Sequence, residues 1–139
     1  MSGELANWPR HLAPEAHSED YVFCHLKQGA YGALASCSPL ASILEDDGLS
    51  LILPQAEADR EGLSYRGVFC CLSLRVYSSL EGVGLTAAIA TELAHHNISA
   101  NMIAGTRHDH ILVPKADKER ALAALKTLSA RHLPEDEGS

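Results

Sequence analysis

Two glycines, Gly82 and Gly84, separate an apolar run from an amphipathic stretch in the sequence SSLEGVGLTAAIATELAHHNIS, residues 78–99. Glycine permits positive φ and lets another group approach the backbone closely. The first amides of a helix that begins here, around Gly84, Leu85 and Thr86, have no acceptor within the helix. They could bind a carboxylate or a phosphate. Alternatively, the glycines only make the turn, and a side chain caps the helix.

Two hydroxyl residues, Ser78 and Ser79, precede this glycine turn and could add hydrogen bonds to an anion held there. The turn lacks the Gly-Lys-Ser/Thr ending of a Walker A loop, and it does not have GxGxxG spacing. The sequence therefore gives no indication of a nucleotide site.

A second cluster of chemically active residues is His108, Asp109 and His110. On a strand, His108 and His110 would share a face. Neutral imidazoles so placed could bind zinc, with Asp109 or another residue of the second half completing the site. Two ligands at this spacing do not make a site, so we expect no metal and no cofactor. The other interpretations are a polar hairpin tip, or contacts from His108 or Asp109 to a small ligand.

Signatures of catalysis are missing from the sequence. It contains no GxSxG or HExxH motif. The four cysteines, Cys24, Cys37, Cys70 and Cys71, show no CxxC spacing and no evident base beside them. We therefore expect reduced, mostly buried thiols and no enzyme activity. A metal-dependent enzyme that uses His108, Asp109 and His110 is the alternative.

Composition excludes several classes of partner. The chain has 139 residues, 46% of them hydrophobic and 21% charged, which is typical of a globular domain. A net charge of -7 argues against nucleic acid. No apolar run approaches the length of a membrane span, and the first residues do not resemble a signal peptide. The expected location is cytoplasmic, with no membrane partner.

Hydrophobic periodicity predicts alternating strands and helices. Strands are expected at 21–26, near 33–36, at 67–78, and within 97–105 and 110–114; a hairpin at 40–54; and helices at 54–62, 85–96 and after Asp117. The predicted organisation is a flexible arm (1–20), a first unit (21–66), a second unit (67–130) and an acidic tail (131–139). The two units repeat a weak βαββα order, which predicts an α+β fold with antiparallel sheets and helices on one face.

The sequence of the second unit predicts no closing strand. A full βαββαβ unit needs one more strand after its last helix, and RHLPEDEGS is a poor candidate. Since an unpaired sheet edge is unfavourable, we expect the early strand Tyr21–Leu26 to fill the place.

The stretch SSLEGVGLTAAIATELAHHNISANMIAGTRHDHILVP resembles the ACT domain, as found in small bacterial tandem-ACT proteins and in the arginine-sensing tandem-ACT proteins of animal cells. Its matching features are VGLTA, LAHHNIS and the HDHILVP hairpin. ILEDDGLSLILP is similar to the first domain of the bacterial group, although Ser50 stands where threonine is more typical. The resemblance covers residues 21 to about 128.

The resemblance implies two ferredoxin-like βαββαβ units side by side, a regulatory role and a small-molecule ligand, which we expect to be an amino acid. It places the ligand between the units, against the glycine turn. The ligand-binding residues implied or expected are Ser79, Gly82, Val83, Gly84, Leu85, Thr86, Asn101, His108 and Asp109. Asn101 lies in ISANMIA, which is similar to the ligand strand of lysine-regulated aspartate kinases. A homodimer is compatible with this family, and an assembly module without ligand is the alternative.

Overall fold

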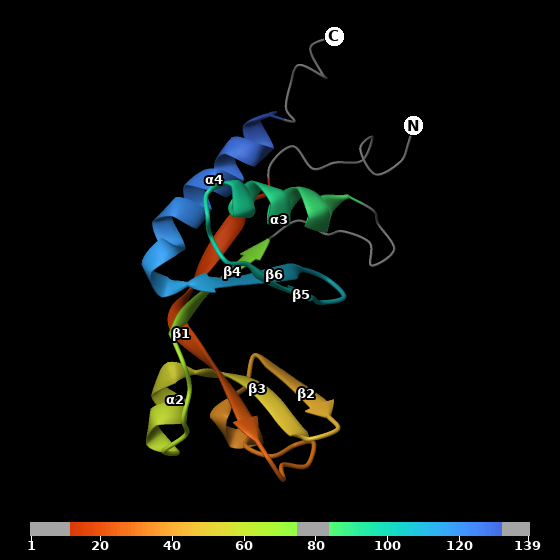
Figure 1. Cartoon of the computed structure of the whole chain (residues 1–139), viewed down its shortest axis with the longest axis vertical. Helices are drawn as coiled ribbons and strands as arrows, with labels where there is room; N and C mark the ends of the chain where they lie inside the picture. Colours follow the sequence, from red (N-terminus) through yellow and green to blue (C-terminus); the bar gives the residue numbers. More distant parts are fainter. Residues whose placement is uncertain (1–11, 75–83, 132–139) are drawn as a thin grey trace. The chain divides into compact units, whose positions relative to one another are not determined.

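The computed structural model describes residues 12–74 and 84–131 (Figure 1). The chain divides into two compact units. The continuous unit is Ser18–Cys70, and the discontinuous unit combines residues 1–17 with 71–139. Two strands, β1 (Pro14–Leu26) and β4 (Phe69–Leu74), run from one unit into the other along the chain.

The continuous unit contains a three-stranded antiparallel arrangement in the order β2-β3-β1. Its further elements are η1 (Ala35–Cys37), β2 (Ala41–Glu45), β3 (Gly48–Pro54) and α2 (Gln55–Arg60). Tyr21 pairs with Pro54, and Leu26 pairs with Leu49. The hairpin between β2 and β3 depends on Gly48, which has φ 138 and whose Cβ would lie 2.3 Å from the Leu26 carbonyl oxygen. No other residue type fits this position without backbone movement.

A small apolar core holds the continuous unit together. Its buried members come from both strands of the β1–β3 pair, from η1 and from α2: Val22, Cys24, Cys37, Leu49, Leu51, Leu53 and Ala58. Burial raises the pKa of the Cys24 thiol. A thiol that is held protonated in this way is a poor nucleophile, so its role in this unit is packing.

The discontinuous unit has strand order β1-β4-β6-β5. Its elements after β4 are α3 (Leu85–His95), β5 (Asn101–Ala104), β6 (Asp109–Pro114), η2 (Lys115–Asp117) and α4 (Lys118–Arg131). Figure 1 shows α3 and α4 on the same side of this sheet. The helices contribute buried Ile89, Leu93 and Leu125, which provide the apolar layer that the sheet needs on that side.

Alternation along β4 separates two kinds of side chain. Cys70, Leu72 and Leu74 share one face, and Cys71 and Ser73 share the other, since neighbouring residues of a strand point to opposite sides. The second face is therefore where this strand carries polar atoms.

Most of the predicted elements are present. The structure confirms the hairpin at 40–54, the helix after Pro54 and the helix from Leu85. It also confirms the strands expected within 97–105 and 110–114 and the helix after Asp117. The short strand expected near residues 33–36 is wrong: this connection forms the 3₁₀ turn η1, flanked by Leu34 at φ 61 and Ser38 at φ 53. Residues in the left-handed region cannot continue a strand, so the chain bends here.

The prediction for the early strand is correct in existence and wrong in extent. β1 begins at Pro14, so residues 14–20 are strand and not arm. The polar sequence PEAHSED has little strand propensity of its own, but β1 neighbours β4 in the sheet. Pairing within a sheet overrides local propensity. The predicted domain limits, residues 21–66 and 67–130, stay a prediction.

The closing strand of the second half does come from the early part of the chain, but from an earlier segment than Tyr21–Leu26. Those six residues pair with β3 in the continuous unit. The part of β1 that belongs to the discontinuous unit ends at His17. Leu12, just before β1, is fully buried, and its N–H donates to Ser129 Oγ at 2.8 Å, which ties the start of the strand to α4.

We predict that Leu12→Ala lowers the free energy of unfolding by about 2–5 kcal/mol, because a fully buried leucine leaves a cavity when truncated. The matched control is Leu44→Ala, at a leucine that is 63% exposed, where we expect a change within about 0.5 kcal/mol. Urea denaturation of both variants measures the difference. Equal effects would show that the segment before β1 contributes nothing to the fold.

We also predict that residues 67–139 expressed alone do not form a stable monomer. This fragment lacks β1, so β4 would lose one of its two neighbours in the sheet and leave a row of backbone groups unpaired. An amide NMR spectrum and the mass in solution provide the check. Dispersed resonances from a monomer would contradict the prediction.

Candidate functional site

The glycine turn is described only at its end. Ser79, Gly82 and Val83 lie outside the described residues. Gly84 is the N-cap of α3, with φ 108 and ψ -33, and its carbonyl accepts the Ala88 N–H at 2.9 Å. A positive φ of this size is open to glycine and strained for other residues. The backbone conformation at position 84 therefore favours glycine.

The first turn of α3 offers backbone donors, and no described residue crowds the side-chain position of Gly84. Gly84 has no side chain with which to cap the helix, and no described atom lies within 4 Å of the position that a Cβ would take. Leu85 is half-buried, while Thr86 and Ala87 are exposed. The N–H groups of this turn have no intrahelical acceptor and lie at the positive end of the helix dipole. Such a helix start can bind a carboxylate.

Asn101 begins β5 and is exposed. Its Nδ2 donates to the Leu112 carbonyl oxygen at 3.3 Å. Leu112 is its partner in the β5–β6 hairpin, whereas Asp109 pairs with Ala104 at the other end. Asn101 and Asp109 are therefore three residue steps apart along the hairpin, about 10 Å. The structure does not bring these two predicted ligand residues together.

The residues of the HDH motif belong to two kinds of structure, because His108 lies in a turn and Asp109 and His110 lie on β6. His108 is exposed in the tight turn before β6, where its carbonyl accepts the Gly105 N–H at 2.9 Å. The turn needs Gly105, because a Cβ there would lie 2.8 Å from that same carbonyl oxygen. β6 begins only at Asp109, so the expectation that His108 and His110 share a strand face is wrong.

His110 instead joins a polar cluster on the face of β4 that carries Cys71 and Ser73. Ser73 Oγ lies 2.6 Å from His110 Nδ1 and 2.7 Å from His17 Nε2. The two imidazole rings meet edge to face, with centroids 6.4 Å apart. Cys71 Sγ lies 4.0 Å from Ser73 Oγ. One serine hydroxyl therefore bridges two histidines from the strands on either side of it.

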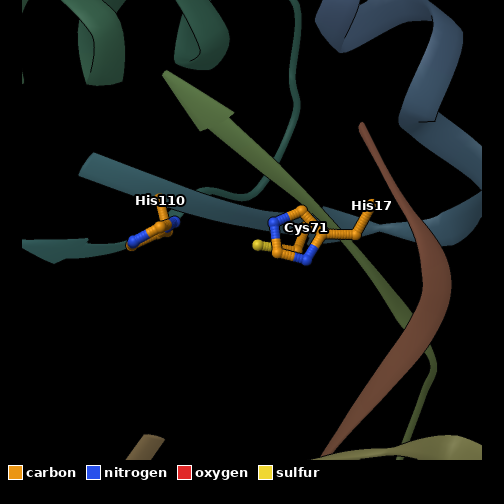
Figure 2. Close-up of side chains that lie close together, drawn as sticks. All are labelled: His17, Cys71 and His110. Carbon is orange, nitrogen blue, oxygen red and sulfur yellow. The ribbon is translucent and has the colours of Figure 1, made fainter. Parts of the chain in front are cut away.

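Figure 2 shows His17, Cys71 and His110 converging from β1, β4 and β6. Their ligand atoms all lie within 4.8 Å of one another. Cys71 is fully buried, Ser73 is 8% exposed, and both histidines are half-buried. The pKa of His110 lies below its ordinary value, chiefly because burial disfavours the charged ring, with the nearby His17 and His108 adding to the effect.

His17 is not among the residues expected in a site, because it lies in residues 1–20, which the sequence indicates as an arm. The mixed face of β4 was visible in the alternation of Cys71 and Ser73 with leucines. His110 is already among the candidate zinc ligands of the HDH motif. No sequence signal indicates His17, since nothing local marks residues 14–20 as strand.

An apolar cavity of about 670 Å³ lies between the start of β1 and one side of α4. Alanine side chains and Leu122 form much of its wall, and the charged residues Glu119 and Lys126 also line it. Ser129 also lines it, but its hydroxyl already accepts the Leu12 N–H.

Comparison with known proteins places the chain in a family. Two models described as "ACT domain" match it in tandem, one at residues 3–71 and the other at residues 68–127. The chain belongs to the ACT-domain family and carries two such domains, which have the ferredoxin-like βαββαβ fold. No curated protein matches the sequence.

Solved structures agree with this assignment. A protein of unknown function from Vibrio cholerae, described as a possible transport protein, is 47% identical, with a TM-score of 0.78 over 84% of this chain and 88% of that one. A protein from Agrobacterium tumefaciens is 17% identical, with a TM-score of 0.71 over 86% and 90% of the two chains. The regulatory subunit of aspartate kinase from Thermus flavus is 10% identical, with a TM-score of 0.62 over 84% and 96%.

The last two similarities show the fold alone. ACT domains are typically regulatory modules that bind small molecules, commonly amino acids, and they often form oligomers. Within residues 12–74 and 84–131, none of the helices has the length and apolar character needed to span a membrane.

We predict that Gly84→Ala destabilises the chain by about 1–3 kcal/mol, because φ 108 strains any residue with a Cβ. Nothing described crowds this position, so the cost comes from the backbone and not from a clash. Thermal unfolding of the variant measures it. An unchanged melting temperature would mean that the turn relaxes freely. A bulkier residue at Gly84 would strain the backbone and could also block a ligand. A loss of binding in such a variant could therefore not be assigned to either cause, so it is a poor test of a ligand site.

Proposed function

We propose that this protein is a regulatory module that acts by binding a small molecule, an amino acid, and not by catalysis. The tandem ACT domains support a regulatory binding role. The observation that supports the position of the ligand is the start of α3, where the N-cap is a glycine and no described residue crowds its side-chain position.

In this proposal the ligand carboxylate accepts hydrogen bonds from the amides after Gly84, with Leu85 and Thr86 in the first turn. The helix dipole adds a favourable interaction with the negative charge. Ser79, Gly82 and Val83 belong to the same proposed site by their place in the sequence. Asn101, His108 and Asp109 are candidates for the rest of the ligand, although Asn101 lies about 10 Å along the hairpin from Asp109.

Selectivity for an amino acid over other anions needs a group that recognises the ammonium. Asp109 carries the required charge, and it lies at the start of β6, beside the turn that contains His108. The net charge of -7 disfavours large polyanions. A small zwitterion fits this combination better than a nucleotide or a nucleic acid. We further propose a cytoplasmic protein with a regulated partner, and a homodimer as its assembly.

An assembly module that has lost its ligand is the second candidate. Its support is the exposure of Ile43 and Leu44 on β2, which stands at the end of the strand order. An exposed apolar edge strand favours pairing with another chain. A metal-dependent enzyme built on the HDH motif is not proposed, because His108 is exposed in the turn before β6, whereas His110 contacts Ser73.

The test is thermal unfolding of the full chain with each of the twenty amino acids. One amino acid at a hundred times its Kd should add about 2.7 kcal/mol to the free energy of unfolding. No shift with any amino acid, together with a concentration-dependent mass in solution, would favour the assembly module instead.

The position of the site is tested with Ala87→Glu, at the exposed third residue of α3. We predict that this carboxylate stabilises the ligand-free protein by about 0.3–1 kcal/mol through the helix dipole, while it competes with the carboxylate of the ligand and abolishes the amino-acid shift. Ala87→Gln has the same shape without the charge and should keep the shift. An undiminished shift in Ala87→Glu would place the ligand elsewhere.

A further inference from the structure

Three side chains that can ligate a metal converge outside the proposed amino-acid site. We propose that His17, Cys71 and His110 bind one divalent transition-metal ion of the zinc class. The three residues come from three strands of the discontinuous unit, and their ligand atoms lie within 4.8 Å of one another (Figure 2). This inference is independent of the amino-acid proposal, because it uses none of the same residues.

The donor set suits zinc. Two imidazole nitrogens and one thiolate are borderline-soft ligands, which zinc prefers over the oxygen ligands that magnesium and calcium require. Three protein ligands leave a fourth tetrahedral position for water or a small anion. Such a site is chemically different from a closed structural site with four protein ligands.

The distances are compatible with a site that tightens around an ion. Zinc–nitrogen bonds of about 2.0–2.1 Å and a zinc–sulfur bond of about 2.3 Å imply ligand atoms about 3.3–3.6 Å apart in a tetrahedron. The observed separations reach at most 4.8 Å, so movements of about an ångström close the gap. Side-chain rotation of the two half-buried histidines supplies such movements, while Cys71 stays in the buried strand.

Ser73 shows that the two imidazoles are aimed at a common point. Its hydroxyl lies within hydrogen-bond distance of one nitrogen from each ring. A hydroxyl can donate to one neutral imidazole and accept from the N–H of the other. Ser73 would move aside or become an outer hydrogen-bond partner of the bound ion.

A second group, His25, Glu45 and Asp47, also brings potential ligands within 4.8 Å. All three residues are exposed, and His25 Nε2 is within 2.9 Å of the Asp47 carbonyl oxygen. Exposed carboxylates are stabilised by water and do not need an ion. This group therefore serves as the internal control for surface binding.

The experiment uses the full-length, reduced protein after chelator treatment, titrated with Zn²⁺ or Co²⁺ alone. We expect one equivalent of Zn²⁺ to raise the melting temperature. Co²⁺ should produce a near-ultraviolet thiolate-to-cobalt charge-transfer band together with visible bands of a four-coordinate ion. The spectrum needs no substitution, so it stays informative even where a variant folds poorly.

Paired variants assign the ligands. His110→Ala and His17→Ala should weaken Zn²⁺ binding by at least about ten-fold, and His108→Ala, two residues away in the exposed turn, should not. Cys71→Ala should abolish the charge-transfer band, and Cys70→Ala, the adjacent thiol on the opposite face, should keep it. His25→Ala should still bind one Zn²⁺ ion per chain. Ser73→Ala should retain binding, because the ligands remain.

Several outcomes would overturn the proposal. They are the absence of a Zn²⁺ effect on the melting temperature, a Co²⁺ spectrum without the thiolate band, or loss of binding in His25→Ala or His108→Ala but not in His110→Ala. In each of these cases His17, Ser73 and His110 form only a structural hydrogen-bond network. Ser73→Ala would then lower stability equally with and without Zn²⁺.

Discussion

One strand, β1, is the constraint on which both units depend. Its residues from Tyr21 onward pair with β3, and the strand also neighbours β4. A sheet strand contributes to stability through backbone pairing on both of its sides. Loss of β1 would therefore leave β3 with only β2 as a neighbour, and β4 with only β6. The polar PEAHSED segment is part of this strand because pairing demands it, not because its composition favours a strand.

This constraint explains how much of the fold could be predicted. Elements with a strong periodicity, such as α3 and the β2–β3 hairpin, follow from the residues themselves. The start of β1 and the 3₁₀ turn η1 do not. β1 begins where a partner strand is available, and η1 forms where Leu34 and Ser38 take left-handed conformations that their types do not announce. In both cases the local conformation depends on contacts within the folded chain and not on local residue type.

The candidate sites also divide into one that local sequence indicates and one that only the folded sheet assembles. The backbone requirement at Gly84 is local, so the sequence indicated it, and the structure supports it with φ 108. The cluster around Ser73 is assembled from residues that are 56 and 37 positions away along the chain. No rule based on sequence spacing could identify this cluster, because the number of residues between its members depends on which strands become neighbours in the sheet. The resemblance to ACT domains implied the fold, but it implied no ligand role for His17, Cys71 or His110.

The register of one hairpin decides which histidine has access to the cluster. Because Gly105 N–H bonds the His108 carbonyl, the turn includes His108, and the strand starts one residue later. His110 is then the first histidine on the face shared with Ser73, and His108 remains in solvent. A shift of one residue would send His110 to the opposite face, since strand side chains alternate. Gly105 fixes this register, because a Cβ at that position would lie 2.8 Å from the His108 carbonyl oxygen. A glycine in the turn before β6 thus helps to determine whether His110 lies on the face that carries Ser73.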